Sequence, residues 1–127
     1  MRLLLDTHIF LALIGSGSID LPVTVAAVLK DGDTEPHLSA VSLWEIAIKY
    51  RLGKLRLAVE LDALPELLKR FAVRIVPINE QHALAAVKPE PATRDPFDRM
   101  LLAQCQIEGL KLVTIDRALV MHPLAAG

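Results

Sequence analysis

The chain has 127 residues, 53% of them hydrophobic, so it can bury one core and is not a disordered protein. Its formal net charge of −1 provides no overall attraction to nucleic acid, and such binding would need a local basic patch. The one cysteine, Cys105, excludes an internal disulfide and a cysteine zinc cluster, and it permits a reducing, cytoplasmic location. No apolar run is long enough to span a membrane, and Asp6 and His8 interrupt the opening segment, so it does not resemble a signal peptide.

Predicted strands and helices alternate along the chain. In order, they are a strand at 2–5, helices at 8–14 and 21–30, a strand at 37–40, helices at 41–52 and 63–72, a strand at 73–78, helices at 80–87 and 97–109, and a strand at 111–115. This alternation predicts a three-layer α/β fold, with a central parallel sheet of about four or five strands and helices on both faces. The Pro-rich segment 88–96 is a short connection, so residues 1–127 are predicted to form a single domain.

Four acidic residues fall where predicted strands give way to helices. Asp6 and Asp116 directly follow the first and last strands, and Glu45 and Asp98 lie in the first turns of two predicted helices. Ligands of open α/β sheets bind beyond the carboxyl ends of the strands. The four carboxylates are therefore predicted to lie near one edge of the sheet.

Each acid also has a simpler explanation as a helix cap. Ser42 and Glu45 have the spacing of a capping box. Asp95, followed by Pro96, fits an N-cap, and Asp98 then lies favourably near the helix dipole. Caps do not need to share one edge of a sheet, however, and converging carboxylates repel each other unless a cation lies between them.

An oxygen-rich acidic site selects hard cations, here Mg²⁺ or Mn²⁺. Such sites commonly hydrolyse phosphodiesters, because the metal activates a water molecule and stabilises the reacting oxygens. The chain has no GxSxG elbow, P-loop or HExxH motif that would indicate another hydrolytic apparatus.

Four segments carry a family resemblance: LLLDTHIFLALI, SAVSLWEIAIKYRLGKL, RDPFDRMLLAQ and EGLKLVTID. From Arg2 to Arg117 the chain resembles the PIN domain, and specifically the VapC toxins of toxin–antitoxin pairs. The resemblance implies a metal-dependent endoribonuclease that cuts structured RNA, such as tRNA or rRNA. It also implies a homodimer and a small VapB-like antitoxin, through which alone the toxin would contact DNA. The acids it places around Mg²⁺ or Mn²⁺ are Asp6, Glu45, Asp98 and Asp116.

Several neighbouring residues are further candidates. Those that would support the metal site are Thr7, Thr114 and Asp95, although each also has a local structural explanation. Trp44 is expected to be a core residue or a dimer contact. The densest basic stretch is a candidate RNA-binding cluster, or else it stabilises a helix C-terminus, and it comprises Lys49, Arg51, Lys54 and Arg56.

Two alternatives from other classes remain. One is a catalytically idle PIN-like module that acts only as a partner in an antitoxin–DNA repressor complex, although such a module has no need of four intact acids. The other is a haloacid-dehalogenase-type phosphatase, whose second aspartate would stand where this chain has His8. The tail 117–127 departs from the family pattern, because its short apolar stretch precedes a proline and the last strand is in doubt.

Overall fold

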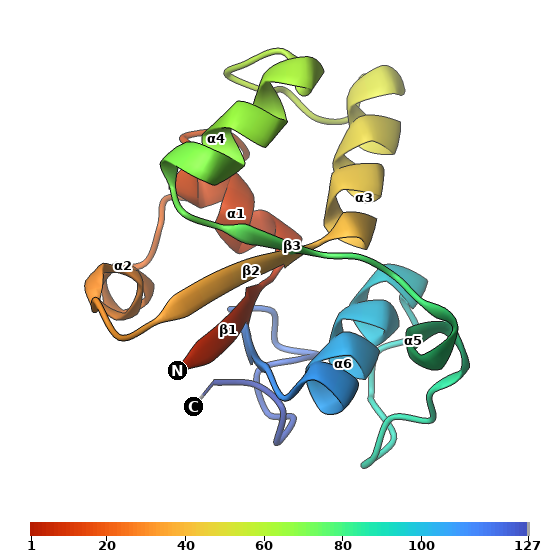
Figure 1. Cartoon of the computed structure of the whole chain (residues 1–127). Helices are drawn as coiled ribbons and strands as arrows, with labels where there is room; N and C mark the ends of the chain where they lie inside the picture. The colour runs from red at the N-terminus through yellow and green to blue at the C-terminus, as the bar shows by residue number, and fades with distance from the viewer. Residues whose placement is uncertain (127) are drawn as a thin grey trace.

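A computed structural model describes residues 1–126. Its core is a four-stranded, all-parallel sheet with the order β3-β2-β1-β4 (Figure 1). The strands are β1 (Arg2–Leu5), β2 (Glu35–Ser39), β3 (Arg74–Val76) and β4 (Lys111–Val113). The helices are α1 (Thr7–Leu13), α2 (Val23–Lys30), α3 (Ala40–Arg51), a 3-10 turn η1 (Leu61–Ala63), α4 (Leu64–Arg70), α5 (Glu80–Leu84) and α6 (Pro96–Glu108).

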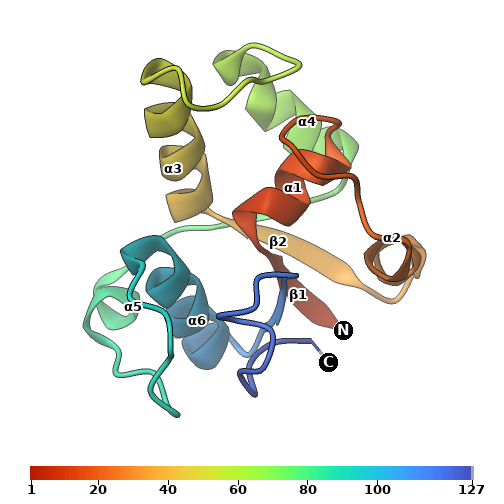
Figure 2. The ribbon, with the colours of Figure 1, turned by 180° about the vertical axis from the view of Figure 1, so that it is seen from behind.

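The central strand β1 separates two apolar cores. Leu3 and Leu5 pack with residues of α1, α2, α3 and α4, whereas Leu4 packs with α6 and β4 on the opposite face. Figures 1 and 2 show α1 and α4 on one side of the sheet and α5 and α6 on the other. A strand that is apolar on both faces suits the middle of a parallel sheet. The predicted three-layer α/β fold is confirmed.

Burial of β1 contributes strongly to stability. Leu3, Leu4 and Leu5 are fully buried. Full burial of one leucine side chain stabilises the folded state by about 1.5–3 kcal/mol. The same strand delivers Asp6 to the carboxyl edge of the sheet, so the residues that stabilise the fold also fix the position of an acid.

The tail returns alongside β4. The Leu112 amide donates to the carbonyl of Leu124, and the Ala126 amide donates to the carbonyl of Leu112, both over 2.8 Å. Leu112 and Ala125 form a single parallel bridge. The tail therefore occupies the position of a fifth strand, although within residues 1–126 no strand follows Val113.

Two further sequence predictions have clear outcomes. Cys105 is buried in α6, as expected of a core residue, and this burial raises the pKa of its thiol to about 12. Trp44 was expected to be a core residue or a dimer contact. It is 61% exposed, so the first alternative is wrong and the second stays a prediction. Its ring meets that of Phe97 edge-on at a centroid distance of 5.9 Å. Within residues 1–126 no helix is both long and apolar enough to cross a membrane.

Candidate active site

The carboxyl edge of the sheet is where the acidic residues gather. Asp6 follows β1, and Asp116 lies three residues beyond β4. Glu45 lies on α3, which follows β2, and Asp98 lies in the first turn of α6. Figure 2 shows the starts of α1, α3 and α6 close together at this edge.

Asp6 occupies the N-cap position of α1, but its side chain makes no capping hydrogen bond. Instead its Oδ2 accepts a hydrogen bond of 2.7 Å from the hydroxyl of Thr114. Burial raises the pKa of Asp6, and the charge of Asp116 raises it further. The Thr114 hydroxyl, the charge of His8 and the backbone amide of Thr7 lower it, and together they do not cancel the effect of burial.

Thr114 holds Asp6 in a defined way. Its Oγ1 accepts a hydrogen bond of 3.0 Å from the backbone amide of Asp116 while it donates to Asp6. Because the amide can only donate, the threonine proton must point to the carboxylate. The side chain of Asp116 accepts a 2.8 Å bond from the amide of Ala118, which closes the turn after β4.

The start of α6 has a second arrangement of the same kind. Asp95 is the N-cap, as predicted, because its Oδ1 accepts from the amides of Phe97 and Asp98 at 2.8 and 3.4 Å. The Thr93 hydroxyl accepts from the Asp95 amide and donates to Asp98 Oδ2, each over 3.2 Å. Arg99 holds this segment in place through its Nε, which donates to the Thr93 carbonyl over 2.9 Å.

Asp98 is electrostatically coupled to the other aspartates. Burial raises its pKa to about 6, with further contributions from the charges of Asp95, Asp6 and Asp116 and an opposing one from the Thr93 hydroxyl. The charge of Asp116 therefore disfavours ionisation of both Asp6 and Asp98, and the charge of Asp6 disfavours ionisation of Asp98. The structure brings three of the four predicted acids into one electrostatic group.

Glu45 is held differently from the three aspartates. Its Oε2 lies 2.7 Å from Nζ of Lys49, one turn further along α3. The capping-box interpretation was wrong, because Ser39 caps α3 by accepting from the Val41 amide over 3.0 Å. Ser42 is buried inside the helix, where its Oγ accepts a 2.8 Å bond from Thr7. The Thr7 hydroxyl thus joins α1 to α3 instead of donating to an acid.

The donor set suits a hard cation in its chemistry. Among residues 1–126, no three aspartate, glutamate, histidine or cysteine side chains are arranged as a ready metal-binding group. The three aspartates nevertheless offer only oxygen ligands, and a cation would favour the ionised forms of Asp6 and Asp98, which burial and, to a smaller extent, neighbouring acids disfavour. Lys49 pairs with Oε2 of Glu45, so its charge competes with a cation for this carboxylate.

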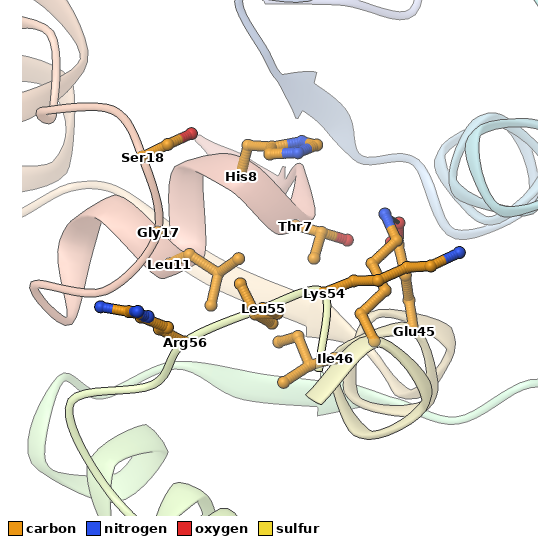
Figure 3. A pocket seen from close by; sticks show the side chains of 11 residues that line it. Thr7, His8, Leu11, Gly17, Ser18, Glu45, Ile46, Lys54, Leu55 and Arg56 are labelled. Carbon is orange, nitrogen blue, oxygen red and sulfur yellow. Dashed lines mark hydrogen bonds and ion pairs between the residues drawn. The ribbon is translucent and has the colours of Figure 1, made fainter. Parts of the chain in front are cut away.

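A cavity of about 340 Å³ opens beside the acidic edge, between α1, α3 and the loop after α3 (Figure 3). Thr7 and Glu45 line the side of this cavity that faces the acids. Three of the four predicted basic residues line it, and Arg51 does not. The full lining is Thr7, His8, Leu11, Gly17, Ser18, Glu45, Ile46, Lys49, Lys54, Leu55 and Arg56.

Sequence reasoning missed Thr93 and Arg99. A usable signal for Thr93 was the repeated Thr-x-Asp pattern, TRD at 93–95 and TID at 114–116. In both copies the threonine accepts from the amide of the aspartate two residues later. Arg99 directly follows Asp98, but its contacts to backbone carbonyls have no sequence signature.

Comparisons with known proteins bear on the fold and the family of the chain. A search of the curated proteins found no match. Among solved structures, the chain is similar to one from a "Toxin-antitoxin complex from Klebsiella pneumoniae", with 19% sequence identity and a TM-score of 0.68. That similarity covers 98% of this chain and 96% of the other, and it supports the fold. The sequence profile of the PIN domain matches residues 3–121, so the chain belongs to the PIN domain family.

Proposed function

We propose that this protein is a metal-dependent endoribonuclease, the toxin of a toxin–antitoxin pair, which hydrolyses phosphodiester bonds in structured RNA such as tRNA or rRNA. PIN domains are generally nucleases and typically use a divalent metal. The observation that carries the proposal is the placement of Asp6, Asp98 and Asp116 at the carboxyl edge of the sheet in a chain of the PIN domain family.

In this proposal Asp6, Asp98 and Asp116 hold Mg²⁺ or Mn²⁺, and Glu45 completes the set. When bound, the ion supplies a water of lowered pKa and neutralises charge that develops on the phosphate. Ionised Asp6 and Asp98 are the forms that bind a cation. The hydroxyls of Thr114 and Thr93 favour these forms, because each donates a hydrogen bond to a carboxylate.

The remaining polar residues prepare the surroundings of the acids. Asp95 keeps the start of α6 in place, so Asp98 is free of capping bonds. Lys49 balances the charge of Glu45 and is a cation at the acidic edge that an RNA phosphate can approach. Both roles concern positioning and binding, and neither residue is assigned a proton transfer.

The proposed partners follow the same family assignment. They are a VapB-like antitoxin that covers the site, an RNA substrate and a second copy of this chain, with DNA contacted only through the antitoxin. The structural neighbour comes from a toxin–antitoxin complex, which supports the first of these. The exposed Trp44 ring is a surface on which a dimer contact can be tested by light scattering of the Trp44→Ala variant.

The test is RNA cleavage by the purified chain with and without chelator. Activity should vanish in excess EDTA and return with Mg²⁺ or Mn²⁺, whereas Ca²⁺ should bind without restoring the rate, because its geometry is looser. Asp33→Asn, which removes an exposed carboxylate far from the site in sequence and fold, is the matched control for site variants. Undiminished cleavage in EDTA would reject the mechanism. Antitoxin binding without any cleavage would favour the catalytically idle module instead.

A further inference from the structure

The cavity beside the acidic edge has the composition of a nucleotide site. Its interior side chains Leu11, Ile46 and Leu55 form an apolar floor, and cationic side chains lie around it (Figure 3). Its volume of about 340 Å³ lies in the range of small-molecule pockets. We propose that this pocket holds one unstacked nucleoside of a single-stranded RNA segment, next to the phosphate at the acidic edge. The inference rests on the proposed function and names the part of the substrate recognised.

Lys54 and Arg56 lie at opposite ends of the apolar floor, an arrangement that suits two successive phosphates of an RNA chain better than a single anion. In Figure 3 the Lys54 side chain reaches toward Glu45, whereas Arg56 lies at the other end of the floor, near Gly17. Among residues 1–126, neither Lys54 nor Arg56 has an ion-pair partner. Each nucleoside in RNA is flanked by two phosphates, so an apolar floor between two free cations matches its charge pattern.

The apolar floor is a surface on which a nucleobase can pack. A protein that reads single-stranded RNA splays out bases and packs them on apolar or aromatic side chains. Leu55 is half-buried and is the accessible part of this floor, whereas Leu11 and Ile46 are buried and pack beneath it in the core, which fixes its position. An apolar peptide would cover this floor but would leave the two cations without partners, and charge complementarity therefore favours the nucleotide.

The pocket is held open by the fold itself. The buried Ser16 hydroxyl accepts a 2.9 Å hydrogen bond from the Ala58 amide, which ties the loop after α1 to the loop after α3. The Lys54 amide donates to the Lys49 carbonyl over 2.9 Å, which fixes the turn that carries Lys54. Both walls are thus fixed by hydrogen bonds before any ligand binds, which lowers the entropic cost of binding.

The test is a titration of the full chain, with ¹³C-labelled Leu and Ile methyl groups, followed by NMR in EDTA. The probes are UMP, AMP and ribose 5-phosphate. We expect the methyl signals of Leu11, Ile46 and Leu55 to shift saturably with each nucleotide. Ribose 5-phosphate should bind at least about fivefold more weakly, because it lacks the apolar base.

Variants locate the binding site. Lys54→Gln and Arg56→Gln should each weaken nucleotide binding about two- to fivefold, as loss of an exposed charge contact does. Ser18→Trp places a bulky ring at the exposed pocket wall and should abolish the shifts. The matched controls are Arg70→Gln and Val23→Trp, which make the same changes at exposed positions outside the pocket. Unchanged methyl signals outside the pocket will confirm that each variant is folded.

Several outcomes would overturn the inference. Equal affinity for ribose 5-phosphate would identify a phosphate site without base recognition. The absence of shifts at the highest soluble nucleotide concentration would reject the nucleotide pocket. Shifts of these methyls by an acidic peptide alone would identify a protein-docking surface instead. The titration needs no catalysis, so nucleotide binding without cleavage would reject the proposed function and keep the pocket. Cleavage with a wild-type kcat/KM in Ser18→Trp would reject the pocket and keep the function.

Discussion

Two regions of the site use the same hydrogen-bond arrangement in different settings. At the end of β4, Thr114 accepts from the Asp116 amide and donates to Asp6. At the start of α6, Thr93 accepts from the Asp95 amide and donates to Asp98. In each region the backbone amide orients the threonine hydroxyl, and this hydroxyl then donates a hydrogen bond to one carboxylate. We call these the strand arm and the helix arm.

The arms differ in range and in strength. The strand arm joins Thr114 to Asp6 across 108 residues over 2.7 Å, whereas the helix arm joins Thr93 to Asp98 across five residues over 3.2 Å. Asp6 is buried and Asp98 is partly exposed. The strand arm therefore depends on the assembled sheet, and the helix arm depends on the local geometry of residues 93–98. The comparison indicates that one of these aspartates is placed by the fold and the other by its own loop.

The largest expected effect is loss of either carboxylate. Asp6→Asn and Asp98→Asn should each reduce RNA cleavage by at least about 100-fold, the scale seen when one group that stabilises developing charge is removed. Both should also reduce the stabilisation gained on adding Mg²⁺, since that gain depends on affinity of the folded state. Denaturant melts in EDTA and in Mg²⁺ give the second measurement. Equal Mg²⁺-induced shifts in both variants and the wild type would leave the two aspartates without a metal role.

Removal of the Thr114 and Thr93 hydroxyls tests whether the strand arm and the helix arm differ in strength. Thr114→Val leaves a buried carboxylate and a backbone amide without this partner, so it should destabilise the protein by about 1–3 kcal/mol and lower kcat about tenfold. Thr93→Val should cost less in both respects, because its bond is longer and Asp98 has access to water. The Thr→Ser variants, which keep the hydroxyl, should restore most of the rate at each position. An equal loss in the two Val variants would remove the distinction between the arms.

The pH dependence of stability in the metal-free protein tests the environment of Asp98 separately from that of Asp6. The pKa of Asp98 is raised to about 6, so the folded state binds a proton more tightly than the unfolded state does. This group's contribution to stability is therefore present below about pH 4 and is lost as the pH rises through about 6. Asp98→Asn lacks that loss, and it should be more stable than the wild type above pH 6, by on the order of 1 kcal/mol once partial exposure is allowed for.

The measurement is a series of denaturant melts in EDTA between pH 4 and pH 8. The difference between Asp98→Asn and the wild type should be near zero at pH 4 and should open as the pH increases. Asp33→Asn, which removes an exposed carboxylate elsewhere, should follow the wild type throughout. A constant difference at all pH values would mean that the folded protein does not raise the pKa of Asp98.

The fold could be predicted from the sequence because it depends on local patterns. Leu3, Leu4 and Leu5 form a strand that is apolar on both faces, which is the pattern of a central parallel strand. The position of Asp6 directly after this strand could also be read from the sequence, whereas the metal role of the four acids stays a prediction. The contact from Thr114 to Asp6 could not be predicted, since it spans 108 residues and depends on strand order. Ser42 was misassigned as a cap because helix α3 begins three residues earlier, so the hydroxyl points to Thr7 instead.

The smallest expected effect is that of replacing Asp95, whose backbone amide belongs to the helix arm. Asp95 caps α6, and asparagine caps a helix about as well as aspartate, so Asp95→Asn should change the free energy of unfolding by only a few tenths of a kcal/mol. The charge of Asp95 does raise the pKa of Asp98, however, and the variant removes this contribution. In the pH series, the loss of stability that comes from Asp98 should therefore occur at lower pH in Asp95→Asn than in the wild type. Asp95→Ala is the informative contrast, because it removes the same charge and also the cap, and it should be about 1 kcal/mol less stable than Asp95→Asn at every pH. If Asp95→Asn left the pH profile unchanged, the two aspartates of the helix arm would not interact, and Asp95 would be a cap alone.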